Sequence, residues 1–103
     1  MPKKFKVEIT QTAQTDISAI WDHISSESPI NAIKFLDELE RKMMSLDTNP
    51  ERQPVIPECE FFPIAGYRHL VFKKYRIVYR VQNEIVWILR VFHGSMLLDI
   101  SGL

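Results

Sequence analysis

Apolar and polar residues alternate at the start of the chain and then recur at helical spacing. Between residues 5 and 10 every second side chain is apolar, a pattern that predicts a half-buried β-strand. An amphipathic helix should follow, because apolar residues then recur on one helical face. This face would consist of Ala13, Ile17, Ile20, Trp21 and Ile24. Either Thr10 or Thr12 could cap the helix.

A second amphipathic helix is predicted after a short break. Ser28 suits its N-cap position and Pro29 its first helical position. Its apolar side would consist of Ala32, Ile33, Leu36, Leu39, Met43 and Leu46. The Thr-Asn-Pro sequence at residues 48–50 should end it. Two amphipathic helices separated by so short a break predict an antiparallel helical hairpin.

The second half of the chain has the pattern of β-strands. Residues 49–66 contain four prolines and predict an extended connection, in which a short edge strand could form. Three strand-like runs follow at residues 67–72, 75–81 and 85–93. Because the connections between these runs are short, they predict an antiparallel meander. The tail, residues 95–103, could form a last strand or a frayed end.

These elements predict one α+β domain that spans residues 1–103. An N-terminal strand, a two-helix antiparallel hairpin and a three-stranded antiparallel meander would form one sheet with the helices packed on one face. The composition, 46% hydrophobic and 25% charged, is ordinary for a soluble globular protein. Cys59 is the only cysteine, and no apolar run approaches the roughly 18–20 residues that span a bilayer. Because a lone cysteine excludes an intrachain disulfide, we expect a cytoplasmic protein in a reducing compartment.

Charge is distributed unevenly although the net formal charge is zero. Residues 67–93 contain six basic residues against one acid, a balance of +5. Residues 8–60 contain four basic residues against eleven acids, a balance of −7. Four of the basic residues in the strand region are arginines: Arg68, Arg76, Arg80 and Arg90. A sheet core needs no arginine, so these side chains either pin other protein groups or face a polyanion or an acidic partner.

Two of these arginines can be placed relative to each other. Arg76 and Arg80 have the same parity within one predicted strand, so they should point the same way. The orientations of Arg68 and Arg90 depend on the registers of other strands. Each arginine could instead lie along apolar surface and pair with a carboxylate on a helix.

An ordered set of residues between positions 7 and 94 matches a known family. The set comprises Thr10, Ala13, Asp16, Ile17, Ile20, Ile24, Ser28, Pro29, Ala32, Phe35, Leu46, Pro50, Tyr67, Arg68, residues 75–81 and residues 91–94. In this order it resembles the RelE/ParE superfamily of bacterial toxins from type II toxin–antitoxin modules, and within it the ParE-like plasmid stabilisation proteins. The resemblance implies a toxin that a cognate antitoxin neutralises and that needs no cofactor. Its target would be DNA gyrase in the ParE-like branch, or the ribosome in the RelE-like and YoeB-like branches, which cleave messenger RNA there without a metal.

The choice between these targets depends on the residues available for RNA cleavage. This chemistry needs a base, an acid and cations around the phosphate. The candidates are Glu58, Arg68, Arg80 and His93, with Arg76 as an alternative to Arg80. Both nuclease patterns are incomplete, because residues 95–103 hold no Lys, Arg or Tyr, and Gly94 stands where YoeB-like enzymes have tyrosine.

The ParE-like pattern, His-Gly followed by arginine, is matched except that Ser95 replaces the arginine. We therefore favour a non-enzymatic inhibitor of DNA gyrase. A ribosome-dependent messenger RNA endonuclease and a degenerate toxin that only binds its antitoxin are the alternatives.

The resemblance also implies how the antitoxin binds. Antitoxins of these modules use an acidic, amphipathic C-terminal segment that folds on the toxin. We expect the antitoxin or the target to contact Arg68, Arg76, Arg80, Arg90 and His93. A homodimer and a heterotetramer with the antitoxin both stay open, and no membrane partner is expected. No metal site is expected either, since His23, His69 and His93 lack the spacing of metal ligands.

Overall fold

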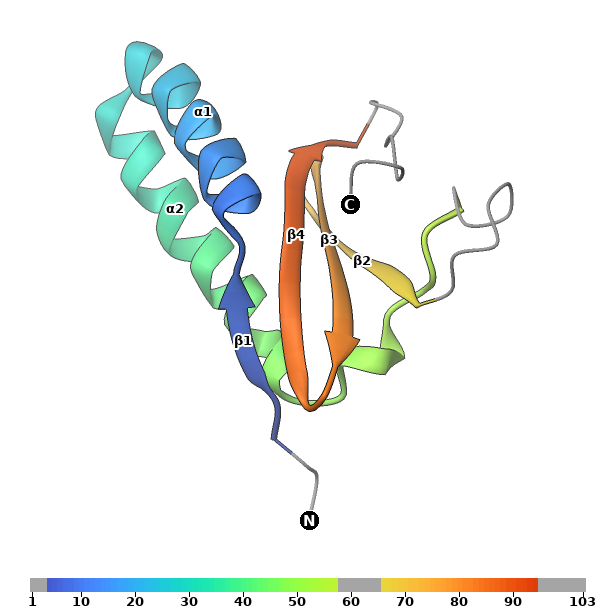
Figure 1. Ribbon diagram of the computed structural model, residues 1–103. Helices are drawn as coiled ribbons and strands as arrows, with labels where there is room; N and C mark the ends of the chain where they lie inside the picture. Colours follow the sequence, from blue (N-terminus) through green and yellow to red (C-terminus); the bar gives the residue numbers. More distant parts are fainter. Residues whose placement is uncertain (1–3, 58–65, 95–103) are drawn as a thin grey trace.

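The computed structural model describes residues 4–57 and 66–94 of the 103-residue chain, and Figure 1 shows their arrangement. In chain order the elements are β1 (Lys6–Ile9), α1 (Gln11–Glu27), α2 (Pro29–Met44), the 3₁₀ turns η1 (Ser45–Asp47) and η2 (Pro50–Arg52), β2 (Tyr67–Phe72), β3 (Tyr75–Gln82) and β4 (Ile85–His93). No helix in this part of the chain is long and apolar enough to cross a membrane.

The four strands form one sheet in the order β1-β4-β3-β2. β2, β3 and β4 pair antiparallel as a meander, whereas β1 pairs in parallel with β4. The two helices lie side by side on one side of this sheet (Figure 1). This arrangement confirms the predicted α+β fold, with its N-terminal strand, helical hairpin and meander.

Both helices begin at the residues that the sequence indicates. The Thr10 hydroxyl accepts a hydrogen bond from the Ala13 amide at 3.2 Å and donates one to the Ile88 carbonyl at 2.9 Å, so this cap also ties α1 to β4. Ser28 caps α2 through the Asn31 amide at 3.3 Å, and Pro29 is the first residue of the helix. The α-helical part of α2 ends at Met44 and the chain continues as the turn η1, slightly before the predicted stop at residues 48–50.

The main core lies between the helices and the sheet. Its buried residues are Ala13, Phe35, Leu39, Met43, Leu46, Phe72, Ile77, Tyr79, Val86, Ile88 and Val91. Ile33 was predicted in this core but is 59% exposed, whereas Phe35 is only 8% exposed. The buried stripe of α2 runs through Ala32, Phe35, Leu39 and Met43, and Ile33 lies about 100° around the helix from Ala32.

A smaller cluster lies on the face of the sheet away from the helices, called here the open-sheet face. Its buried residues are Ile56, Tyr67, Val78 and Phe92, with Leu89 packed against them. Ile56 reaches this cluster because the chain before it runs along β2. The Ile56 amide donates to the Tyr67 carbonyl at 3.0 Å, and Val55 forms an isolated antiparallel bridge with Arg68.

A β-bulge in β4 changes which side chains face the helices. The pairing with β3 shifts between Val78 and Tyr79, which leaves Leu89 as an extra residue in β4. Ile88 and Val91, three positions apart, therefore both lie in the main core, while Leu89 packs on the open-sheet face. Strict alternation would place Ile88 and Val91 on opposite faces.

Several sequence predictions concern residues outside the described ranges. Glu58, Cys59 and the tail that begins at Ser95 belong to these residues. The predicted edge strand between residues 49 and 66 is described only as far as residue 57, where the bridge at Val55 is its one paired position among the described residues.

Candidate functional site

The four arginines of the strand region lie on two different faces of the sheet. The guanidinium carbon of Arg76 is 5.2 Å from the centroid of the Phe92 ring, and that of Arg80 is 5.8 Å from the centroid of the Tyr67 ring. Both rings belong to the cluster on the open-sheet face. The prediction that Arg76 and Arg80 point the same way is therefore confirmed. Stacking on an aromatic ring holds a guanidinium group without neutralising its charge.

Arg90 is instead bound by Asp16 of α1. Its Nε donates to Asp16 Oδ2 at 2.7 Å and its Nη2 to Asp16 Oδ1 at 3.1 Å, a two-pronged pair. The Val91 amide donates to the same carboxylate at 3.0 Å. The hydrogen bond that Arg90 donates to Asp16 raises the pKa of Arg90 above its ordinary value, although burial lowers it. Arg90 and Asp16 thus join β4 to α1 next to the bulge.

Arg68 lies on the helix side of the sheet. It stands opposite Tyr79, whose ring is part of the main core, and side chains directly opposite in an antiparallel pair share a face. Arg68 Nη1 donates to the Gln53 carbonyl at 2.6 Å, and the Tyr79 hydroxyl donates to the Pro50 carbonyl. Burial raises the pKa of Tyr79 to about 12, an effect that the nearby charge of Arg68 partly opposes. These contacts hold the chain after α2 against the end of β2.

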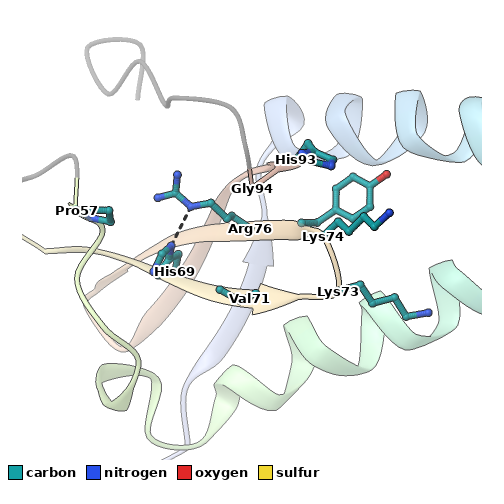
Figure 2. A pocket seen from close by; sticks show the side chains of 9 residues that line it. Pro57, His69, Val71, Lys73, Lys74, Arg76, His93 and Gly94 are labelled. Carbon is teal, nitrogen blue, oxygen red and sulfur yellow. Dashed lines mark hydrogen bonds between the residues drawn. The ribbon is translucent and has the colours of Figure 1, made fainter.

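A cavity of about 510 Å³ lies where the β2–β3 turn meets the end of β4. Its walls carry two histidines, three cationic side chains, one tyrosine and small or apolar residues: Pro57, His69, Val71, Lys73, Lys74, Tyr75, Arg76, His93 and Gly94. We call it the cationic cavity. No carboxylate is among these lining residues within the part of the chain that the structure describes. Figure 2 shows these side chains, which come from β2, β3, their turn, the end of β4 and, for Pro57, the segment before β2.

The best-defined contact in the cationic cavity joins Arg76 to His69. Arg76 Nε donates to His69 Nδ1 at 3.0 Å, drawn as a dashed line in Figure 2. Because Nδ1 accepts this hydrogen bond, it carries no proton, and a neutral His69 carries its proton on Nε2. Arg76 is only 7% exposed, held between this histidine and the Phe92 ring.

His93 lines the cationic cavity from the end of β4. It stands opposite Tyr75 in the sheet, and the two rings meet edge to face at 5.9 Å between centroids. Gly94 follows and donates its amide to the Lys74 carbonyl at 2.7 Å. A Cβ atom at position 94 would lie 3.3 Å from that carbonyl oxygen and 3.6 Å from Arg76 Cγ. A larger side chain here would press on the Lys74 backbone and on Arg76.

The structure brings together some of the predicted site residues and separates others. Arg76 and His93 line one cavity. Arg80 lies near the other end of β3, opposite Trp87, and Arg68 lies on the helix side. Glu58 is outside the described residues. Two of the four candidates for RNA cleavage, Arg68 and Arg80, therefore do not join His93 in the cationic cavity.

Sequence reasoning missed His69, Lys73 and Lys74 as members of this site. A usable signal existed in the two-residue turn Lys73-Lys74. Such a turn pairs Phe72 with Tyr75 and Val71 with Arg76, which brings His69 diagonally near Arg76 on one face. Within residues 4–57 and 66–94, no group of three or more His, Cys, Asp or Glu side chains could hold a metal ion.

Comparisons with known proteins agree with this fold. A family model described as the ParE toxin of the type II toxin–antitoxin system parDE matches residues 7–98. A chain from the chromosomal ParDE toxin–antitoxin system of P. aeruginosa superposes with a TM-score of 0.75 at 21% identity, covering 90% of this chain and 99% of that one. A chain from the RelBE2 toxin–antitoxin complex of Mycobacterium tuberculosis superposes with a TM-score of 0.55 at 26% identity, covering 90% and 94%. No curated protein matches the sequence.

The family model covers most of the chain, and the chain from the ParDE system shares the fold described above. The chain therefore belongs to the ParE toxin family and, more broadly, is a RelE/ParE-type toxin of a type II toxin–antitoxin system.

Proposed function

We propose that this toxin inhibits DNA gyrase by binding and is neutralised by a cognate antitoxin. The choice of target rests on one observation: the candidate nuclease residues do not lie together. Arg68 is held on the helix side by the Gln53 carbonyl, and Arg80 lies opposite Trp87, away from His93 at the end of β4. Inhibition by binding needs no general base or acid, and a basic surface with aromatic residues suffices. The match to the ParE model supports the same choice.

The antitoxin surface in this proposal is the open-sheet face. Arg76 and Arg80 both lie there, stacked on the rings of Phe92 and Tyr67. Arg90 is left out of this surface because Asp16 of α1 already binds its guanidinium group. Both structural relatives come from systems titled as toxin–antitoxin pairs, which supports an antitoxin partner. An acidic segment on this face would place its carboxylates against two oriented guanidinium groups.

A ribosome-dependent endonuclease is the second candidate function, and one observation favours it. His69 and His93 line one cavity with Arg76 and Lys74, so a scissile phosphate bound there would have two imidazoles and two cations in the surrounding walls, whereas Lys73 pairs with Glu38 at 3.1 Å. One imidazole would accept a proton from the 2′-hydroxyl, while Arg76 and Lys74 would stabilise the charge on the phosphate.

Two assays on the purified toxin separate these functions. The proposal expects inhibition of gyrase supercoiling at stoichiometric toxin and no cleavage of messenger RNA on programmed ribosomes. Cleavage that is lost in His93→Ala, with a wild-type circular dichroism spectrum, would establish the endonuclease instead. Inactivity in both assays, with no growth arrest on expression, would identify a toxin that only binds its antitoxin.

The antitoxin surface has its own test with matched variants. We expect Arg76→Glu and Arg80→Glu each to weaken binding of an acidic partner by more than about tenfold, because each replaces attraction by repulsion. Lys34→Glu makes the same charge change at an exposed position on α2 and should bind nearly as the wild type does. Equal affinity of both arginine variants and the wild type, in calorimetry on folded protein, would exclude the open-sheet face. Light scattering of the toxin, alone and with its partner, gives the oligomeric state.

A further inference from the structure

A row of three side chains crosses the open-sheet face, away from the cationic cavity. Tyr67 of β2 stands opposite Arg80 of β3, and Arg80 in turn stands opposite Trp87 of β4. Side chains directly opposite each other on neighbouring antiparallel strands share a face of the sheet. The guanidinium carbon of Arg80 lies 5.8 Å from the centroid of the Tyr67 ring. The row therefore consists of one arginine flanked by two aromatic residues.

A pocket of about 160 Å³ lies beside this row, and we call it the Arg80 pocket. The three residues of the row line it together with Thr10, Gln82 and Leu89. Leu89 belongs to the pocket because the bulge in β4 adds this residue to the open-sheet face. Since an interior cavity of roughly 150 Å³ holds one benzene-sized molecule, the pocket has room for one side chain of a partner.

The charge of Arg80 is available in this pocket. The Arg80 side chain is exposed, and the Tyr67 ring orients its guanidinium group without neutralising it. In the part of the chain that the structure describes, no carboxylate forms an ion pair with Arg80. The Thr10 hydroxyl is already used in the cap of α1. The polar groups that the pocket offers to a ligand are thus the guanidinium group of Arg80 and the amide of the exposed Gln82.

These walls favour a glutamate side chain over a nucleic acid. A carboxylate needs one cation, and Arg80 supplies it. The two methylene groups of a glutamate would lie against the apolar surfaces of Trp87 and Leu89. A single-stranded nucleic acid also stacks on aromatic rings, but it carries a phosphate at every nucleotide and needs a positively charged groove. Among the described residues that line this pocket, Arg80 is the only cation, so a polynucleotide would gain little from it.

We propose that the Arg80 pocket binds one glutamate side chain of the acidic antitoxin segment. This inference rests on the proposed antitoxin-binding face and names a subsite within it. The guanidinium group of Arg80 and the amide of Gln82 donate hydrogen bonds to the glutamate carboxylate. The methylene groups of the glutamate cover part of the Trp87 ring. Binding therefore moves Trp87 out of water.

The fluorescence of Trp87 reports directly on the pocket. The chain has one other tryptophan, Trp21 on α1, so a Trp21→Phe background leaves Trp87 as the only one. Suitable probes are three decapeptides, in which leucine alternates with glutamate, aspartate or glutamine, and an oligothymidylate. We expect the glutamate peptide to shift the emission of Trp87 to shorter wavelength. The aspartate peptide should bind about fourfold more weakly, because its shorter side chain buries one methylene group less.

Variants in the same background separate the charge of Arg80 from the shape of the pocket. Arg80→Gln should bind the glutamate peptide about fivefold more weakly, the upper end of the range for an ion pair at a protein surface, and the glutamine peptide unchanged. Lys34→Gln removes the same charge at an exposed position on α2 and should not change binding. Leu89→Phe keeps every charge but fills part of the pocket, so it should also weaken binding of the glutamate peptide. Gln82→Tyr narrows the pocket from an exposed position and replaces Leu89→Phe if circular dichroism shows that the latter does not fold.

The possible results lead to different conclusions. If Arg80→Gln weakens binding while Leu89→Phe and Gln82→Tyr do not, Arg80 acts only as a surface charge, so the pocket is wrong but the proposed face stands. If Arg80→Gln binds the glutamate peptide as well as Lys34→Gln does, both the pocket and the face are wrong. Equal binding of the glutamate and glutamine peptides would overturn the carboxylate as the ligand. Tighter binding of the oligothymidylate, lost in Arg80→Gln, would replace the peptide by a nucleic acid.

Discussion

Replacing Asp16 by asparagine should destabilise the fold more than any other exchange of a carboxylate for an amide in the described part of the chain. The Asp16 carboxylate accepts three hydrogen bonds, from Arg90 Nε at 2.7 Å, from Arg90 Nη2 at 3.1 Å and from the Val91 amide at 3.0 Å. An asparagine side chain has one oxygen for these three donors. Its amide group would direct N–H bonds at another donor, and the charge that attracts Arg90 would be lost.

The magnitude follows from the burial of the pair and the number of bonds. The side chain of Asp16 is 16% exposed and that of Arg90 is 33% exposed, so water screens the interaction only in part. Hydrogen bonds to charged groups contribute roughly 1.5–3 kcal/mol each. With a discount for the exposed part of Arg90, we expect a loss of about 2–3 kcal/mol in the free energy of unfolding. For a domain of this size that corresponds to a fall in Tm of roughly 10–20 °C.

Urea unfolding followed by circular dichroism measures this loss. Asp22→Asn is the matched control, because Asp22 lies exposed on the same helix, and it should change stability by less than about 0.5 kcal/mol. The double variant with Arg90→Gln should lose less than the sum of the two single losses, because both remove the same interaction. If Asp16→Asn is as stable as Asp22→Asn, the pair does not hold α1 to β4 and the reasoning fails.

Other expected outcomes concern the two sides of the sheet. Tyr79→Phe leaves the Pro50 carbonyl without its donor and should cost about 1–2 kcal/mol in urea unfolding. Because burial raises the pKa of Tyr79 from 10.0 to about 12, the folded protein keeps this proton longer than the unfolded chain. Stability should therefore fall between pH 10 and pH 12, by at most about 1.4 kcal/mol per pH unit, and Tyr79→Phe should fall less over that window. Asn83 and Glu84 have φ values of 53° and 65°, a turn geometry that favours the sequence Asn-Gly. Glu84→Gly should therefore raise the free energy of unfolding by about 0.5–1 kcal/mol. An unchanged Tm in this variant would show that Glu84 is not strained.

The spacing of apolar residues along the chain predicted most of the fold. Alternating residues and helical stripes predicted each strand and helix, and Ser28-Pro29 marked the start of α2. The exception on α2 is Ile33, which was predicted in the core and is exposed. Ile33 and Phe35 are both apolar and close in sequence, and only the rotation of the helix against the sheet decides which one is buried. Amphipathic patterns leave that rotation uncertain when apolar residues occupy adjacent stripes.

The site was less predictable because it depends on pairing between strands. The shared face of Arg76 and Arg80 follows from alternation within one strand and was predicted correctly. The orientation of Arg90 depends on the bulge at Leu89, for which the local sequence carries no glycine or other recognisable signal. The approach of His69 to Arg76 depends on the register of the β2–β3 hairpin. The two-residue turn Lys73-Lys74 is a local signal for that register, whereas no local signal marks the bulge.

The uneven distribution of charge along the chain does not by itself identify the interface, because part of the basic charge is neutralised inside the domain. The helical layer supplies Asp16 to Arg90 and Glu38 to Lys73, at 2.7 Å and 3.1 Å. On the open-sheet face, the rings of Phe92 and Tyr67 and the neutral acceptor of His69 orient guanidinium groups without adding negative charge. A partner that brings carboxylates to this face would meet the exposed side chain of Arg80, whereas the same partner on the helical layer would meet acidic residues. The assignment of residues to faces, more than the net charge of either half, is what makes the open-sheet face the expected surface for an acidic antitoxin.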